Sequence, residues 1–531
     1  MSRIYKSRPD KAGSRRADQT PVESPDAVQA ANILVGAESR PHNETVPRSM
    51  NQASAMTDEL SEDRPYVPFG YSVPSARTRV TFRTFMYNHI ALTALVASTA
   101  VAFPQYAERM EQAANTKRIP ALVPFPEWPG AASHATFNEF DPVAQKVSTT
   151  GKHAFIAPGP NDIRGPCAGL NAAANHGYLP RSGIATAETI NTGLWEAFGL
   201  DITATEFLQT ATAFFDGDPV SGRWSIGYHS AKTQSLGPVG DLLGNETGIC
   251  AYGHLKTEGD ASITRGDWLA PTSNSNCASY PEFAQELLDL AKSMTGGNIT
   301  PQVLARHQYN RKLHSISTNP NYFSPAYAGV AFTFGAHMFA FQLLANHSAE
   351  HPRGIMTPEV FESFWSYKRD AQGRLQFTYG HERIPENWYR RSQKDAWTLS
   401  DILISTAQQC ASYPENCQVG GNTGEVNSFS GVNLGDISGG FVNSATDLSD
   451  PVRLGCWLSQ MIQADVPSFL DKIFTGAALT QVLGLIPTKL VPGLKGLGSC
   501  PNLPAGKSVT QYGAKYPGAA KFQQYGPRNP Y

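Results

Sequence analysis

The residue with the clearest capacity for chemistry in this sequence is Cys167, in the segment 162–177 (DIRGPCAGLNAAANHG). A Gly-Pro turn precedes the cysteine, and good helix formers follow it up to Gly177, a residue typical of the position just past a helix. Cys167 is therefore expected at a helix N-terminus. There, free backbone N–H groups and the helix dipole stabilise a thiolate, which can act as a metal ligand or as a nucleophile.

The cysteine count bears on this interpretation. Seven cysteines are present, and an odd number in an oxidising compartment leaves one thiol unpaired. Connectivity cannot be read from a sequence, but pairing of neighbours along the chain would give Cys250–Cys277, Cys410–Cys417 and Cys456–Cys500. The ordinary alternative is that Cys167 forms a disulfide or is an inert buried thiol. No CxxC pair, HExxH, Walker loop or GxGxxG sequence offers a competing chemistry.

Two segments carry a family resemblance. The stretch 153–183 (HAFIAPGPNDIRGPCAGLNAAANHGYLPRSG) resembles the signature of the fungal haem-thiolate peroxidases, which include chloroperoxidase and the unspecific peroxygenases. The chain departs from that signature at Ala168, where a second proline is usual. Downstream, the segment 258–262 (EGDAS) is similar to the EGD-x-S motif of peroxygenases. The resemblance covers roughly residues 145–395.

The resemblance implies a mainly α fold, a single helical domain with haem b bound between helices and Cys167 as the proximal iron ligand. The thiolate would donate electron density to the iron and favour O–O cleavage of hydrogen peroxide. Glu258, Ser262 and the Gly259 carbonyl would hold Mg²⁺ beside a haem propionate, because all-oxygen ligation suits a hard cation. Asp260 would orient this loop. The ordinary alternative for the motif is a carboxylate in a solvated loop.

His176 also follows Cys167, but it is not a candidate ligand. It lies nine residues further along the same helix, which corresponds to about 13 Å along the axis. We expect a structural histidine that binds a neighbouring loop.

The resemblance weakens where peroxide cleavage needs an acid–base group. Family members use a glutamate, often helped by an arginine or histidine, on a helix after an Asn-Pro pair. Here Asn319-Pro320 is present, but the glutamate position corresponds to Ala336 and the arginine position to Gly329. Neither residue can move a proton.

Three interpretations of this departure remain open. His337, next to Ala336, could replace the glutamate, since imidazole is a general acid–base near neutral pH; one residue along a helix, however, turns a side chain by about 100°. Another group such as His307 or His314 could serve. Alternatively, His337 is a core histidine and the protein handles peroxide poorly.

The leading hypothesis for function is a peroxide-dependent oxidoreductase that oxidises or oxygenates a small organic substrate. The aromatic segment 322–344 (YFSPAYAGVAFTFGAHMFAFQLL) would line a pocket for aromatic or polyketide-like molecules, although ordinary core packing explains most of those rings. The competing hypothesis is a haem-binding protein with weak or no turnover. A third is a secreted disulfide-bonded protein without haem.

The elements around these motifs are predicted to be mostly helical. Apolar residues recur at helical spacing in 202–215 and 283–294, and Thr357-Pro358 reads as an N-cap and first helical residue. Alternating strands are scarce. Residues 396–531 are rich in Gly, Ser, Asn and Pro, and predict a loop-rich region that packs on the domain, with one helical piece near 453–485.

The bulk properties fit a secreted globular enzyme. The net charge of -2 argues against a nucleic-acid-binding protein. Residues 1–85 read as disordered or as a mis-annotated extension, with translation starting at Met86. The segment 86–102 then reads as a signal peptide, because the uncharged run 90–103 is short for a membrane span and ends in a small-x-small site. The alternative is a membrane anchor formed by 90–103. Four N-x-Ser/Thr sequons, at Asn43, Asn245, Asn298 and Asn346, agree weakly with secretion.

Overall fold

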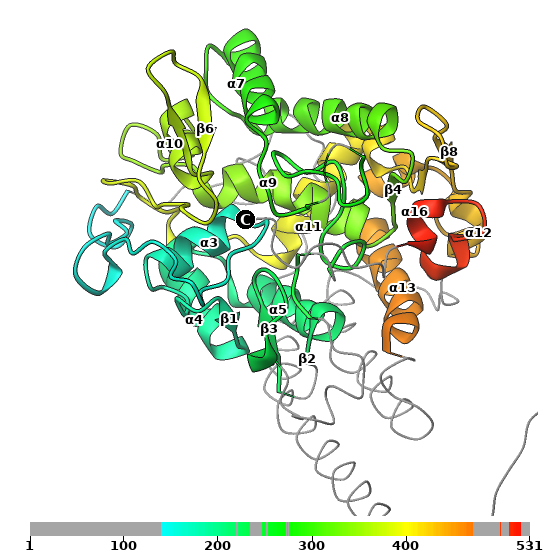
Figure 1. Ribbon diagram of the computed structural model, residues 1–531, viewed down its shortest axis with the longest axis horizontal. Coiled ribbons are helices and arrows are strands. Elements are labelled where there is room, and N and C mark those ends of the chain that lie inside the picture. Colours follow the sequence, from blue (N-terminus) through cyan, green and yellow to red (C-terminus); the bar gives the residue numbers. More distant parts are fainter. Residues whose placement is uncertain are drawn as a thin grey trace, which may run out of the picture. The chain divides into compact units, whose positions relative to one another are not determined.

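The computed structural model describes residues 140–218, 221–233, 247–250, 253–271, 273, 275–470, 500 and 509–521. The protein is mainly helical over this part, as the sequence predicts (Figure 1). The predicted N-terminal extension 1–85 and the signal or anchor segment 86–102 lie outside the described residues. Within them, no helix is both long and apolar enough to cross a membrane.

Three helices form the N-terminal part of the domain: α3 (Ala168–Asn175), α4 (Ala187–Phe198) and α5 (Ile202–Asp216). The sequence signals explain their ends. Thr186 caps α4 in a reciprocal capping box with Thr189, and Asp201 caps α5 by accepting from the Thr203 N–H at 2.9 Å. The predicted helix 202–215 is confirmed to within one residue.

Four helices follow: α7 (Pro281–Thr295), α8 (Pro301–Thr318), α9 (Thr333–Leu344) and α10 (Pro358–Phe364). α7, α8 and α10 begin with proline, whose fixed φ suits the first helical position. Thr357 caps α10 as predicted, by accepting a hydrogen bond from the Val360 N–H at 3.4 Å. A π-helical turn, η3 (Ala328–Phe332), leads directly into α9.

The C-terminal part contains α11 (Leu399–Ser412), α12 (Leu434–Ser438), α13 (Pro451–Leu470) and α16 (Pro517–Ala520). The two longest of these helices are α11, with 14 residues, and α13, with 20, and α13 overlaps the first part of the helical piece predicted near 453–485. The average composition of 396–531 concealed the apolar stripe of α11. Ile402 and Leu403 from this helix belong to the main hydrophobic cluster.

The strands are short and antiparallel. One sheet has the order β1-β3-β2, formed by β1 (Ile184–Ala185), β3 (Arg223–Ser225) and β2 (Gly217–Asp218). A second has the order β4-β7-β8, formed by β4 (Phe323–Ser324), β7 (Gly420–Gly421) and β8 (Ser430–Gly431). The third pairs β5 (Tyr367–Arg369) with β6 (Leu375–Phe377). Short 3-10 turns occur at Gly151–His153, Ala231–Thr233, Gln393–Asp395, Pro414–Cys417, Ala445–Ser449 and Val509–Tyr512.

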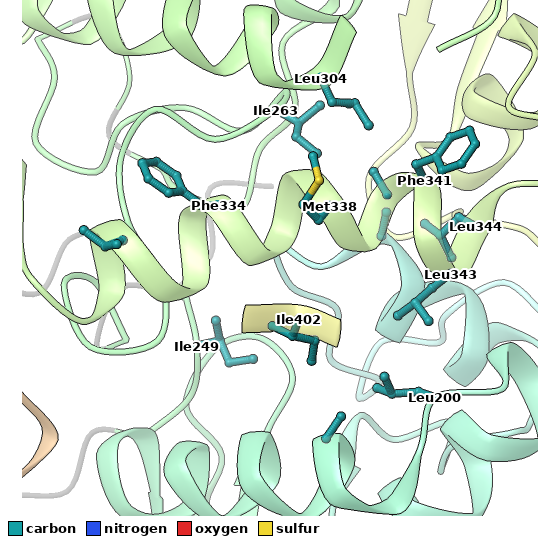
Figure 2. Packing of buried hydrophobic residues seen from close by; sticks show 14 of the residues in the cluster. Leu200, Ile249, Ile263, Leu304, Phe334, Met338, Phe341, Leu343, Leu344 and Ile402 are labelled. Atoms are coloured by element: carbon teal, nitrogen blue, oxygen red, sulfur yellow. The ribbon is translucent and has the colours of Figure 1, made fainter. Parts of the chain in front are cut away.

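The core is organised around α9, which has apolar neighbours on opposite sides. Figure 2 shows Met338 extending toward Ile263 and Leu304 on one side of this helix. On the other side, Leu343 extends toward Leu200, which precedes α5. A helix that is apolar all round in this way must be buried.

Three disulfides link cysteines that are neighbours along the chain: Cys250–Cys277, Cys410–Cys417 and Cys456–Cys500. All seven cysteines lie in the described part, and Cys167 is left as a free thiol. The odd thiol that the sequence required is therefore Cys167.

A buried ion pair ties distant segments together. The Arg265 guanidinium and the Glu382 carboxylate approach to 2.8 Å, with side chains 2 % and 0 % exposed. Arg265 also donates to the Pro166 carbonyl at 2.9 Å and to the Cys277 carbonyl at 3.2 Å. One side chain thus joins the loop before Cys167, a disulfide and the segment after β6.

We expect Arg265→Met to lower the free energy of unfolding by about 3–5 kcal/mol, because it leaves the Glu382 carboxylate buried without its cation. Urea unfolding measures this change. Arg374→Met is the matched control, since Arg374 pairs with Asp370 with 72 % of its side chain exposed, and we expect its unfolding midpoint to stay unchanged. Equal midpoints for the two variants would contradict this account.

Candidate functional site

Cys167 opens onto a cavity of about 220 Å³ that lies between α3, α4, α5, α9 and the loop 257–265. Most of its wall is apolar, and the wall contains Ile190, Leu194, Phe198, Leu200, Leu208, Ile249, Ile263, Phe332, Phe339, Ala340, Leu343, Leu344 and Trp365. Cys167 is the N-cap residue of α3, as predicted, with extended backbone angles. A thiol therefore faces an apolar space from the start of a helix.

The loop before Cys167 is fixed by hydrogen bonds and by a close backbone contact. Asn171 on α3 binds both sides of Gly165: its carbonyl oxygen accepts from the Gly165 N–H at 2.9 Å and its amide donates to the Gly165 carbonyl at 2.8 Å. A Cβ at Gly165 would lie 1.7 Å from the Ile226 carbonyl oxygen. Only glycine fits there, which explains the Gly-Pro turn and fixes where the thiol points.

The pKa of the Cys167 thiol corrects one expectation. Burial raises this pKa, and the lowering by the backbone N–H groups of Leu170 and Gly169 and by Arg265 does not compensate for it. The helix terminus thus acts in the predicted direction, but the apolar surroundings outweigh it. A cation bound beside the sulfur would favour the thiolate form.

His176 has the structural role that was predicted. Its Nδ1 is 2.8 Å from the His153 carbonyl oxygen, and its Nε2 accepts from the Ile384 N–H at 3.2 Å. Burial lowers the pKa of His176, which keeps it neutral and able to accept this bond. The helix ends as expected, with Gly177 at a φ of +67°.

The EGDAS loop lines the same cavity through Glu258, Gly259 and Ser262. Glu258 Oε2 accepts from Asn276 at 2.6 Å and lies 3.1 Å from His254 Nδ1. Oε1 of the same carboxylate is buried and has no hydrogen-bond partner in the described part of the chain. One carboxylate oxygen is therefore fixed, and the other has no partner among the described residues.

Asp260 points into the protein instead. It accepts from the Trp268 N–H at 3.1 Å and from the Asn319 amide at 3.5 Å. Burial raises its pKa well above the usual value, and the nearby carboxylates of Asp267 and Glu258 add to this shift. These contacts suit the orienting role expected for Asp260.

Ala336 lies in the cavity wall, whereas His337 is not among the lining residues. The His337 Nδ1 is 2.8 Å from the Thr333 carbonyl oxygen, and its ring lies 6.2 Å from that of His307 on α8. Burial lowers the pKa of His337 to about 4. The turn of about 100° between successive helical residues accounts for this separation. His307 and His314 also lie outside the lining.

Gly329 cannot be replaced by the expected arginine without rearrangement. It lies in the π-helical turn η3, and a Cβ there would be 2.4 Å from the Ser324 hydroxyl oxygen and 3.0 Å from the Ser324 carbonyl carbon. Ser324 in β4 closes this side of the turn. The backbone around Gly329 therefore leaves no space for the side chain of the expected arginine.

The aromatic side chains of the segment 322–344 lie partly in the cavity wall and partly in the hydrophobic core. Phe332 and Phe339 line the cavity. Phe323 packs against Tyr512 and Tyr516, and Tyr327 contacts Phe215. Core packing thus explains most of the rings, the ordinary interpretation given above.

The polar side of the cavity was not predicted from the sequence. Thr205, Gln209 and Thr212 line it from α5, together with Trp224 from β3 and Thr257. A signal was available, because the α5 residues recur at spacings of three and four, which places them on one helix face. The apolar residues of the same helix make this polar face hard to recognise in the sequence.

Fold and site together define a mainly helical protein that presents one free thiol, at a helix N-terminus, to an apolar cavity. The chain belongs to the family described as Peroxidase, family 2, whose sequence model matches residues 153–393. The resemblance stated from the two motifs is therefore confirmed.

Similarity to known fungal proteins extends beyond that range. A dothistromin biosynthesis peroxidase of Dothistroma septosporum is 34 % identical over 78 % of this chain and 94 % of its own length. An aromatic peroxidase of Fusarium equiseti is 32 % identical over 81 % of this chain and 97 % of its own length. An aromatic peroxygenase of Cyclocybe aegerita is 29 % identical over 64 % of this chain and 81 % of its own length. The protein is accordingly an oxidoreductase that acts on peroxide.

The position of His337 generates a test of its predicted role. We expect His337→Gln to keep peroxide consumption within about twofold of wild type, since the side chain does not reach the cavity. Loss of a general acid–base would instead cost about 10²–10⁴-fold. Steady-state peroxide consumption with a phenolic dye distinguishes the two results. A loss in the larger range, with folding intact by circular dichroism, would show that His337 is the acid–base group.

Proposed function

We propose that this protein is a secreted haem-thiolate peroxygenase or peroxidase, which uses hydrogen peroxide to oxidise or oxygenate an aromatic or polyketide-like substrate. The observation that carries the proposal is the Cys167 thiol, free and facing an apolar cavity from the N-cap of α3. Such a wall suits the porphyrin face of haem b. The thiol is the only cysteine left for an axial ligand, because the other six form disulfides.

The residues present fit both groups that the family implies. Cys167 would hold the iron, with the Leu170 and Gly169 N–H groups directed to its sulfur. Glu258 Oε1, the Gly259 carbonyl and Ser262 would hold Mg²⁺, since a buried carboxylate oxygen without a partner suits a hard cation. When bound, the haem supplies an iron centre whose thiolate ligand favours O–O cleavage of peroxide. The apolar side chains exclude water from this space.

The alternative, a haem-binding protein with weak or no turnover, rests on a specific observation. Ala336 lines the cavity at the position where a proton-moving glutamate was expected, and Glu258 is the only carboxylate among the described lining residues. Asn276 and His254 already engage one oxygen of Glu258. Under this alternative, proton transfer to peroxide is the step that limits the rate of turnover.

The proposal of secretion rests on the three disulfides, which persist in oxidising compartments. The segment 86–102 would be the signal peptide, and an uncleaved anchor at 90–103 remains the alternative. Mass spectrometry of the N-terminus of the protein from culture medium distinguishes the two, because cleavage leaves a chain that begins near Phe103.

Thiolate ligation is tested by the absorption spectrum of the reduced protein under carbon monoxide. We expect wild type to show the strongly red-shifted Soret band of a thiolate–haem complex, and Cys167→Ala to lose it. Cys167→His is a useful companion, because it keeps an iron ligand and is expected to give the spectrum of a histidine-ligated haem. Haem that is absent from wild type, or unchanged in Cys167→Ala, would overturn the proposal.

The missing acid–base group is tested by a gain of function. We expect Ala336→Glu to raise peroxide consumption by about 10²-fold, because it places a carboxyl group in the cavity wall. Burial in this apolar wall raises a carboxyl pKa, and the base is the ionised form, so the gain should grow as pH rises. Ala336→Gln is the matched control, with the same size and no titration. Equal rates for the two variants would mean that proton transfer is not limiting.

A further inference from the structure

Apart from Glu258, three side chains of the cavity wall have a buried polar atom without a hydrogen-bond partner in the described part of the chain. These atoms are Gln209 Oε1, Trp224 Nε1 and Thr257 Oγ1. None of them belongs to the thiol or to the cation-binding loop residues that the proposed function uses. Buried polar atoms are usually paired, so these three atoms are available to bind a ligand in the cavity.

Gln209 is the central member of this group. It lies on the cavity face of α5, one turn from both Thr205 and Thr212, and it is 4 % exposed. Its Nε2 donates to the Thr210 hydroxyl at 3.0 Å. Turning the amide by 180° would exchange the two atoms but still leave one of them unpaired. In either orientation, Gln209 therefore has one hydrogen bond to offer to a ligand.

Trp224 lies beside the C-terminal end of the same helix. It is the middle residue of β3, paired with Ala185 and Gly217, and it is 3 % exposed. A Cβ on Gly217 would lie 2.7 Å from the Trp224 Cβ and 3.1 Å from the Ala213 Cα, so β3 packs closely against the last turn of α5. The indole N–H can only donate. Trp224 thus adds a donor to the wall that holds Gln209.

The walls formed by α4 and α9 are mostly apolar. Leu194 and Phe198 from α4 and Phe339 and Leu343 from α9 are apolar lining residues. Figure 2 shows Leu343 beside Leu200 toward the C-terminal end of α9, whereas Ile249 lies toward the half that contains Phe334. The cavity therefore combines an extensive apolar wall with a restricted polar one. This combination suits a flat aromatic molecule with an oxygen substituent on one edge.

We propose that Gln209 and Trp224 determine substrate specificity by binding a hydroxyl group on an aromatic substrate. A phenolic hydroxyl can donate to the Gln209 carbonyl oxygen and accept from the Trp224 N–H, and Thr257 can bind a second oxygen. The inference deepens the proposed function, on which it rests for the presence of an aromatic substrate. A haem carboxylate on these atoms is the competing occupant, and the test below separates the two.

The test compares two probes that differ only in a hydroxyl group, 2-naphthol and naphthalene. Isothermal titration calorimetry of the purified, haem-loaded protein gives their dissociation constants without any turnover. We expect 2-naphthol to bind wild type about tenfold more tightly, as one hydrogen bond to an otherwise unpaired buried group would give. Gln209→Met removes the amide at similar size, and we expect it to reduce this preference to twofold or less while naphthalene binding stays within twofold.

Two further variants make the result specific. Trp224→Phe keeps the ring and removes the N–H, and we expect it to reduce the preference for 2-naphthol at least threefold. Gln308→Met, at a buried glutamine of α8 outside the cavity lining, is the matched control and should leave the preference unchanged. Wild type without a preference, or a preference that survives in both Gln209→Met and Trp224→Phe, would overturn the proposal. So would loss of bound haem from these two variants, because the polar atoms would then bind the haem carboxylates.

Failure of this inference is distinguishable from failure of the proposed function. The calorimetric preference depends on the protein wall and requires neither thiolate ligation nor peroxide. Absence of the thiolate–haem spectrum would refute the proposed function. The preference for 2-naphthol over naphthalene would still test the roles of Gln209 and Trp224. A normal spectrum with no preference for the hydroxylated probe would refute the specificity assignment alone.

Discussion

The position of the Cys167 thiol depends on one buried cation, Arg265. Its guanidinium binds the Glu382 carboxylate, the Cys277 carbonyl and the Pro166 carbonyl, so four segments that are distant in sequence meet at one side chain. A buried ion pair is no certain source of stability, since desolvation opposes the attraction of the charges. Here the ion pair fixes the positions of the segments that it joins. Arg265 holds the residue just before the cysteine, and the glycine one position earlier is packed against the Ile226 carbonyl.

Around that fixed point, the cavity places a sulfur in surroundings that disfavour its charged form. The N-terminus of α3 and Arg265 favour the thiolate, whereas burial opposes it and prevails. The balance suits the proposed role as a metal ligand, because a bound iron would supply positive charge beside the sulfur. The same reasoning applies to Glu258, whose second oxygen is buried and has no hydrogen-bond partner in the described part of the chain. Both groups are arranged for partners of opposite charge.

The cavity wall formed by α9 differs from what the family resemblance predicts. Ala336 removes the expected carboxylate, and the π-helical turn at Gly329 leaves no space for an arginine beside Ser324. On the neighbouring helix, α5 presents Thr205, Gln209 and Thr212 to the same space. The wall formed by α9 has no titratable side chain among the described lining residues, while hydrogen-bonding groups that do not titrate line the wall formed by α5. This pattern favours recognition of an oxygenated molecule over rapid proton transfer.

The sequence by itself determined the helical class, the helix that starts at Cys167, the ends of several helices and the odd cysteine, because these depend on local turns, caps and counts. It also indicated the family, through two contiguous motifs. Only the tertiary structure decided which way side chains point: Ala336 into the cavity and His337 toward His307, Phe332 into the cavity and Phe323 into the core. It likewise decided the pKa of Cys167, since desolvation depends on packing by residues far along the chain. Spacing along a helix fixes the angle between two side chains, but the neighbouring helices decide which of them meets the site.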